Sequence, residues 1–418
     1  MEKEPLGFLT LGDVDYRDRT VLVRVDINVP LDLEGRRILD KRRIEAIKQT
    51  LDELEPARVV VISHQGRPEK KTYASLHLHY RELSRQHPGR VLFIEDVMGP
   101  AARNAIKNLR PGEILLLDNL RFCAEDLLEG SPAKMAQTYL VRRLAPLFDL
   151  FVNDAFGTAH RAHPSTVGFS YVLPSVAGRL MEREYRMLKH ATSSASGRRL
   201  LILGGGKPET KIPMVKGALD RGLVDKVAIG GLPANVLLKA KGVDLGPRTT
   251  TIVDRVLHKH PGLLDIAIDI LANYSDRVLL PIDVAVNEFG TGRRELQLEE
   301  LPHAADILDI GEQTAGIFAD AIREADIIIV NGPLGFYEHE EFRRGSQLVF
   351  EAVVNSNAFK LIGGADTIAA FNTFGLIDRV DYVSTGGGAM IAFLTGEPLP
   401  AIEALKAAAR RMRGEELP

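Results

Sequence analysis

The sequence contains a single cysteine, Cys123, and no tryptophan in 418 residues. One cysteine excludes an internal disulfide and a zinc site built from cysteines, and is typical of proteins from reducing compartments. The first residues are acidic and polar, so no signal peptide is expected. No apolar run comes near the roughly 20 residues that a membrane-spanning helix requires. We therefore expect a cytoplasmic protein without a membrane partner.

The sequence also lacks a large excess of charge of one sign. It contains 53 Lys and Arg and 56 Asp and Glu, for a formal net charge of -3. This balance gives no sequence-wide positive field, so no nucleic-acid partner is expected. The first 195 residues are nevertheless slightly basic and hold most of the histidines, whereas the rest is acidic. Chance variation in surface charge would explain this difference equally well as an anion site in the first half.

Short apolar runs rich in β-branched residues alternate with amphipathic segments along the whole chain. The runs cover residues 20–27, 58–64, 90–97, 113–119, 150–156, 199–205, 226–231, 278–286, 326–332, 360–364 and 382–386, and clear helical periodicity lies at 42–54, 312–325 and 345–356. Continuous apolar strands separated by helices are typical of βαβ units with a parallel sheet buried on both faces.

The number of strands and the chain length together predict two domains, since one sheet of this many strands would be unusually large. We expect an α/β fold of two doubly wound, parallel-sheet (Rossmann-like) domains joined by a hinge helix. The predicted boundaries are 1–180 for the N-terminal domain, 181–198 for the linker helix, and 199–395 for the C-terminal domain. A C-terminal helix and tail at 396–418 should return toward the N-terminal domain.

Cationic and amide side chains follow the strands of the first half, where ligands of open parallel sheets bind. They are Asp26, Asn28, His64, Arg67, Asn119, Arg121, Asn153 and Asp154, then His160, Arg161 and His163, with Arg43 near the start of the next helix. Any one such arginine is more often a solvated surface cation. The whole group at the strand ends favours bidentate binding of phosphate or carboxylate, and hence a small, highly anionic ligand.

Glycines follow the strands of the second half instead. They stand at 204–206, 230–231, 332, 363–364 and 386–388, with Lys207 and Lys211 after the first cluster and Asp366 after the fourth. Glycine allows close approach of a ligand to the backbone, and helix N-termini bind phosphate. A single cluster is usually only a tight turn, and neither a GxxxxGK[ST] nor a GxGxxG motif is present. Repetition at successive strand ends favours a nucleotide-phosphate site, in which Asp366 could hold a divalent cation.

The motifs resemble those of the phosphoglycerate kinase family in the family's order. The matching segments are RVDINVPLD, SHQGRP, NLRF, VNDAFGTAHRAHPSTVG, LGGGKPETKI, VNGPLGFYE, IGGADT and VSTGGGA, from about residue 20 to 400. At several positions the residue differs from the commonest one in the family and is similar to the archaeal branch. Gln65, Asp118, Ala365 and Pro208 depart from the commonest pattern, and the last two raise a question about the geometry of the phosphate loops.

The resemblance implies specific site residues and partners. For 3-phosphoglycerate they are Asp26, Asn28, Arg43, His64, Arg67, Arg121 and Arg161. For ATP or ADP they are Gly205, Lys207, Lys211, Asn331, Glu338 (to the ribose), Gly363, Gly364, Ala365, Asp366 and Thr367, with Asp366 near Mg²⁺. Catalytic roles fall to Arg43, Lys207 and Lys211.

The implied reaction is reversible phosphoryl transfer from ATP to the carboxylate of 3-phosphoglycerate, giving 1,3-bisphosphoglycerate and ADP. The nucleophile is already an anion, so no general base is needed and the histidines could serve as cationic ligands of the substrate. Each domain would hold one substrate, and closure about the linker would bring the two together. The alternatives are a non-catalytic two-domain protein that binds a small anion, and a nicotinamide dehydrogenase. The sequence predicts no particular oligomeric state.

Overall fold

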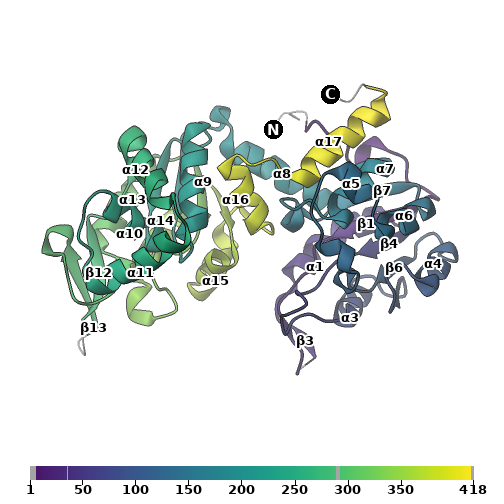
Figure 1. The fold of residues 1–418 in the computed structure, drawn as a ribbon, viewed down its shortest axis with the longest axis horizontal. Coiled ribbons are helices and arrows are strands. Elements are labelled where there is room, and N and C mark those ends of the chain that lie inside the picture. The colour runs from purple at the N-terminus through teal and green to yellow at the C-terminus, as the bar shows by residue number, and fades with distance from the viewer. Residues whose placement is uncertain (1–5, 35, 289–291, 416–418) are drawn as a thin grey trace. The chain divides into compact units, whose positions relative to one another are not determined.

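The computed structural model describes residues 6–34, 36–288 and 292–415. The chain divides into two compact units (Figure 1). Unit 1 comprises Met1–Arg186 together with Pro398–Pro418, and unit 2 comprises Met187–Glu397. The division falls inside helix α8 (Arg179–Thr192).

Unit 1 is built on a six-stranded sheet in the order β5-β6-β4-β1-β7-β8. The strands are β1 (Thr20–Val25), β4 (Arg58–Ile62), β5 (Val91–Ile94), β6 (Ile114–Leu117), β7 (Leu150–Asp154) and β8 (Ser175–Ala177), and all pair in parallel. A short antiparallel pair, β2 (Leu31–Asp32) and β3 (Arg37–Ile38), lies apart from it. Parallel pairing brings all the carboxyl ends of the strands to one edge of the sheet.

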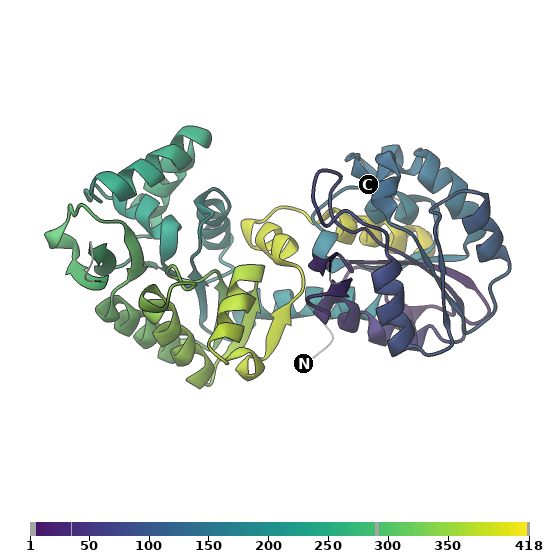
Figure 2. The same ribbon diagram turned by 90° about the horizontal axis from the view of Figure 1, so that it is seen from below.

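The helices of unit 1 lie on both faces of this sheet (Figure 2). They are α1 (Arg42–Ala46), α2 (Lys48–Glu53), α3 (His77–Gln86), α4 (Pro100–Lys107), α5 (Pro132–Ala136), α6 (Tyr139–Leu144), α7 (Phe169–Val172), the first part of α8, and α17 (Pro400–Arg413). Helix α17 packs on β8 and α7, so the C-terminal segment belongs to this unit. Short 3-10 turns and one π-helical turn (Pro164–Gly168) complete the connections.

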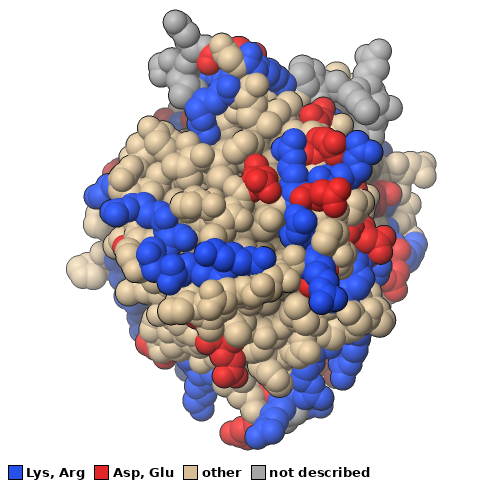
Figure 3. All heavy atoms as spheres, turned by 90° about the vertical axis from the view of Figure 1, so that its right-hand side faces the viewer, with Lys and Arg blue, Asp and Glu red and all other residues tan. Residues whose placement is uncertain are grey.

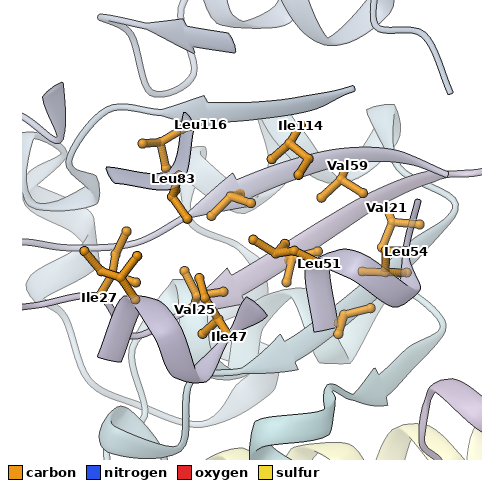
Figure 4. Close-up of a cluster of buried hydrophobic side chains, with 14 of the residues drawn as sticks. Val21, Val25, Ile27, Ile47, Leu51, Leu54, Val59, Leu83, Ile114 and Leu116 are labelled. Atoms are coloured by element: carbon orange, nitrogen blue, oxygen red, sulfur yellow. The ribbon is translucent and has the colours of Figure 1, made fainter. Parts of the chain in front are cut away.

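Alternate residues of β1 supply two different hydrophobic cores, as a strand buried on both faces requires. Val21 and Val25 point with Ile47, Leu51 and other side chains into one core, in which α1, α2 and α3 pack against the sheet (Figure 4). Leu22 belongs to the opposite core, under α4 and α6. Residues 42–54, expected as one helix, form α1 and α2 with a break at Ile47.

Unit 2 contains a second parallel sheet in the order β11-β10-β9-β15-β16-β17. Its strands are β9 (Arg199–Leu203), β10 (Lys226–Ile229), β11 (Val278–Leu279), β15 (Ile327–Asn331), β16 (Phe359–Gly363) and β17 (Tyr382–Ser384). Its helices are α9 (Pro208–Asp220), α10 (Gly231–Ala240), α11 (Pro247–Lys259), α12 (Leu263–Tyr274), α13 (Glu312–Glu324), α14 (Arg344–Asn355), α15 (Ala365–Thr373) and α16 (Gly387–Thr395). The predicted α/β class with two parallel, doubly wound sheets is confirmed.

A small antiparallel sheet in unit 2 corrects one expectation. The run 278–286 is not one strand, because it divides at Pro281 into β11 and β12 (Asp283–Glu288), which lie in different sheets. Strand β12 pairs with β13 (Gly292–Gln297) and β14 (Ile307–Ile310), neither of which is a continuous apolar run. Proline lacks the N–H that a central strand would donate, which explains the break.

Candidate active site

A cavity of about 340 Å³ lies beyond the carboxyl ends of β1, β4, β6 and β7 in unit 1. The seven side chains that the family resemblance implies for the substrate all line it: Asp26, Asn28, Arg43, His64, Arg67, Arg121 and Arg161. Asn119, Asn153, Asp154 and His163, which also belonged to the expected group at the strand ends, do not line it. Most of the lining residues follow separate strands, and the parallel topology brings them to one rim. Lys70, Thr72 and His160 also line the cavity, together with Gly66, Gly157 and Thr158. The Lys70-Lys71 pair shortly after Arg67 is the signal that could have indicated Lys70.

The loop after β1 is held in place by its own polar groups. Asp26 Oδ2 accepts a hydrogen bond from Arg43 Nη1 at 2.7 Å, and the backbone carbonyl of Asn28 accepts a second one at 3.2 Å. Asn28 Oδ1 accepts from the backbone N–H of Gly66 at 3.0 Å, which ties this loop to the one after β4. Asp26 and Asn28 therefore position Arg43 and the Gly66 turn at the edge of the cavity.

Arg121 is the most buried of the cavity-lining arginines, with 8% of its surface exposed. It lies in a 3-10 turn that begins after Asn119, whose side chain accepts from the Arg121 N–H. Its guanidinium donates to the carbonyl of Gly66. Burial, followed by the nearby charge of Arg161, lowers its pKa, but a guanidinium stays protonated throughout the accessible pH range.

Positive charge in the cavity exceeds the negative charge available to neutralise it. The side chains of Arg67 and Lys70 have no hydrogen-bond or ion-pair partner among the described residues, and Asp26 is the one carboxylate that lines the cavity. Clustered cations without counter-charges favour binding of a multiply charged anion.

His64 is a neutral hydrogen-bond donor rather than the cation expected from the sequence. Its Nδ1 lies 3.1 Å from Nη2 of Arg24, which is 1% exposed and does not line the cavity. Because a guanidinium only donates, Nδ1 must be the acceptor and the ring proton is on Nε2. Burial and the charge of Arg24 hold the pKa of His64 well below its usual range.

The two other histidines near the cavity are also driven toward the neutral form. Burial lowers the pKa of His160 and of His163. His160 Nε2 accepts a hydrogen bond from Arg161 Nε at 3.3 Å, which a protonated nitrogen could not do. The expectation of cationic histidines is therefore wrong for His160 as well as for His64.

Unit 2 has its own cavity, of about 360 Å³, between glycine turns and apolar side chains. Of the residues expected to bind nucleotide, Gly205, Glu338 and Asp366 line it. The apolar lining includes Ile252, Val284, Ile307, Leu308, Leu334 and Phe336. A wall of this kind suits a flat base, and the glycine backbone suits phosphate.

Gly204 and Gly332 allow two strand ends to approach closely. A Cβ on Gly204 would come within 2.0 Å of the carbonyl oxygen of Pro333, and one on Gly332 within 2.3 Å of the carbonyl oxygen of Gly204. Gly332 also has φ +106°, in the region that disfavours side chains. These glycines are therefore required by the local packing of β9 against β15.

The other residues expected to bind nucleotide do not line the cavity. Asn331, Gly363, Gly364, Ala365 and Thr367 lie at the ends of β15 and β16, and Lys207 and Lys211 lie at the start of α9. Lys211 Nζ donates to the Asn331 carbonyl at 3.2 Å, and Thr367 Oγ1 accepts from Gly332 N–H at 2.7 Å and donates to the Gly363 carbonyl at 2.8 Å. Burial, with a smaller contribution from Lys207, lowers the pKa of Lys211 to about 8.

The two unusual residues of the phosphate loops fit regular geometry. Pro208 is the first residue of α9, a position that tolerates proline because its N–H would be unpaired, and exposed Lys207 precedes it as the N-cap. Ala365 is the first residue of α15 and follows Gly364, which takes the positive φ of +95°. Neither residue distorts the helix that it begins.

A metal site made entirely of protein groups is absent from the described ranges, since no three His, Cys, Asp or Glu side chains come together suitably there. Two exposed carboxylates, Glu338 and Asp366, line the cavity of unit 2, and Asp366 is the one expected near the metal. This fits Mg²⁺, which usually takes one or two carboxylates together with substrate phosphates and water. Every helix in the described part of the chain is too short or too polar to cross a membrane.

Comparisons with known proteins agree with this arrangement. The phosphoglycerate kinase family model matches residues 11–397. The phosphoglycerate kinase of Methanothermus fervidus is 41% identical over 406 residues, covering 97% of this chain and 98% of the relative. That of Methanocorpusculum labreanum is 41% identical over 401 residues, covering 96% and 98%. Both relatives are from methanogens, which fits the predicted archaeal branch.

Solved structures give the same result. The crystal structure of phosphoglycerate kinase from Pyrococcus horikoshii OT3 has a TM-score of 0.85 and 37% identity, covering 96% of this chain and 99% of that chain. The enzyme from Coxiella burnetii has a TM-score of 0.79 and 32% identity, covering 96% and 100%. The chain belongs to the phosphoglycerate kinase family, whose members transfer a phosphoryl group between ATP and the carboxylate of 3-phosphoglycerate.

Proposed function

We propose that the unit 1 cavity binds 3-phosphoglycerate and that the unit 2 cavity binds ATP or ADP. The observation that carries this assignment is the set of cationic groups from separate strand ends around one cavity of about 340 Å³. A small acid with a phosphate and a carboxylate matches such a site in size and charge. The proposed ligands are Asp26, Asn28, Arg43, His64, Arg67, Arg121 and Arg161.

The nucleotide would be held by backbone and a few charges. Proposed ligands are Gly205, Lys207, Lys211, Asn331, Glu338 (to the ribose), Gly363, Gly364, Ala365, Asp366 and Thr367. The free N–H groups at the starts of α9 and α15 suit phosphate oxygens. Mg²⁺ bound with the nucleotide at Asp366 would neutralise phosphate charge.

Transfer needs no general base, because the attacking carboxylate is already an anion. The protein must instead align two anions and offset the charge that moves between them. We assign Lys207 to the transferred phosphoryl group, with Arg43 and Lys211 beside it. Lys207 suits this role because it is exposed at the start of α9 and its ammonium has no partner within the described residues.

The reacting oxygen and phosphorus must come within about 3–3.5 Å of each other in a water-excluded site. Because the two proposed substrate sites lie in different units, we propose that the units close during turnover and that α8 acts as the hinge. A Met187→Gly change would loosen α8 where the units divide. We expect lower turnover with nearly unchanged affinity for each substrate alone, whereas a parallel loss of both affinities would argue against hinge action.

A coupled assay of ATP consumption on addition of 3-phosphoglycerate and Mg²⁺ tests the proposal. Consumption that requires both additions supports it, and binding without turnover would support a non-catalytic anion-binding protein instead. The relatives named above give that alternative no support. We also propose that the enzyme acts in the cytoplasm, a reducing compartment that its single cysteine favours.

A further inference from the structure

Asn235 is a buried polar residue that lines the unit 2 cavity and has no role in the function proposed above. Asn235 lies on α10, one helical turn after Gly231, and both residues line the cavity. Residues four apart share one face of a helix, so the Asn235 side chain projects from the same face that Gly231 presents to the cavity.

Asn235 is a buried residue that lines the cavity, and its carboxamide has no partner among the described residues. The residue is 7% exposed, and its side chain makes no hydrogen bond to any residue that the structure describes. A buried amide without a partner is costly, so such a group in a cavity points to a ligand that pairs with it.

The other buried polar side chains of this cavity are already engaged. Thr249 Oγ1 accepts from Ile307 N–H at 3.0 Å. Asp309 Oδ2 accepts from Arg293 at 2.8 Å and from Gly345 N–H at 2.7 Å. The second oxygen of Asp309, Oδ1, is buried without a hydrogen-bond partner and lies against Gly335, where an added Cβ would be 2.0 Å from it. Of these three buried side chains, Asn235 is the one that makes no hydrogen bond at all to the described residues.

We propose that Asn235 recognises the base of the nucleotide through the amino edge of adenine. This inference rests on the proposed nucleotide site of unit 2. A carboxamide offers one acceptor and one donor side by side, and the 6-amino group and neighbouring ring nitrogen of adenine offer the complementary pair. Guanine and hypoxanthine carry a carbonyl oxygen in place of the amino group, so their edge with N7 offers two acceptors and only one can be paired. The other side chains that surround the base are mainly apolar, so this pairing makes Asn235 a specificity-determining residue.

The test compares ADP with purine riboside diphosphate, which has hydrogen in place of the 6-amino group, by titration calorimetry on the full chain. The wild type should prefer ADP by about tenfold, as expected for a good bidentate contact. Asn235→Leu, which keeps the side-chain size, should bind both nucleotides about equally. Retention of the preference in the variant, or its absence in the wild type, would overturn the inference.

Two further variants keep the test decisive. Asn273→Leu, at an exposed asparagine of α12, should keep the wild-type preference. If Asn235→Leu does not fold, Asn235→Asp retains an acceptor and loses the donor. Its preference for ADP over inosine diphosphate should then exceed that of the wild type, and an unchanged ratio would contradict the proposal.

The outcome is separable from that of the proposed function. If the wild type turns over ATP with 3-phosphoglycerate but Asn235→Leu keeps the preference for the 6-amino group, only the base-recognition role fails. If the wild type has no such turnover, the proposed function itself fails.

Discussion

The cavities of the two units differ in what they offer a ligand: charged side chains in unit 1, and glycine backbone with apolar side chains in unit 2. The difference follows the chemistry of the proposed ligands. A small acid that is almost entirely charged must be held by cations aimed at it from several directions. A nucleotide combines a flat base, which an apolar wall accommodates, with phosphates that backbone N–H groups can bind.

Surface charge alone does not reveal this difference. On the face of unit 1 shown in Figure 3, Lys and Arg side chains form several clusters, with Asp and Glu gathered mainly on one side. Many surface cations of this unit are paired, for example Arg179 with Glu53 at 2.6 Å. The cavity is distinguished by cations that lack such partners, not by the number of cations.

The largest effect is expected at Lys207, to which we assign the transferred phosphoryl group. Lys207→Ala should lower kcat by about 10²–10³-fold, or about 3–4 kcal/mol, because a donor to the transferred group is lost. Affinity for ADP should change much less. Lys216→Ala, on the same helix but paired with Asp220 and Asp269, serves as the control. A rise in KM without a change in kcat would mean that Lys207 stabilises the bound substrate and the transition state equally.

A smaller loss, of affinity for 3-phosphoglycerate, is expected from an arginine substitution in the unit 1 cavity. Arg67→Ala should weaken 3-phosphoglycerate binding by about 1.5–3 kcal/mol, or about 10- to 150-fold, since a charge-assisted contact is removed. ADP binding should be unchanged, and Arg85→Ala, an exposed arginine paired with Glu82, should affect neither ligand. Calorimetric titration of both ligands would show whether this separation holds, and an equal loss for ADP would contradict it.

The affinity for ADP should depend on pH through Lys211. Burial lowers the pKa of Lys211 to about 8. Below this pH the ammonium is charged and favours phosphate. Above it, binding must take up a proton, so affinity for ADP should fall by up to about tenfold per pH unit. Titrations between pH 7 and 9.5 test this, and Lys211→Arg, which stays charged, should remove the dependence. A flat profile in the wild type would show that Lys211 does not contact phosphate.

The smallest effect is expected at His64. As a neutral donor held by Arg24, it should contribute about 1 kcal/mol. His64→Gln, which keeps an N–H donor, should therefore change 3-phosphoglycerate affinity by less than about fivefold. A loss as large as that of Arg67→Ala would mean that His64 binds as a cation.

The apolar runs predicted most strands of the parallel sheets, because strands buried on both faces leave a strong signal. The same signal failed for β13 and β14, which are partly exposed and lack continuous apolar residues. It also misled at 278–286, where two strands of different sheets adjoin in sequence.

The site residues were predictable to the extent that they follow strands or match family motifs. The sequence could not predict the protonation of His64, because this depends on the contact with Arg24, which lies 40 positions away. Nor could it indicate Asn235, since the lack of a partner for that amide is apparent only once its surroundings are known.

Hydrogen–deuterium exchange of the full chain with each ligand alone is the most direct test of the division between the two cavities. We predict that 3-phosphoglycerate protects the unit 1 segments 26–28, 64–72, 119–121 and 157–161, and that ADP protects 204–211, 231–235, 331–338 and 363–367 in unit 2. Protection of the unit 2 segments by 3-phosphoglycerate, or of the unit 1 segments by ADP, without protection in the assigned unit would contradict the account.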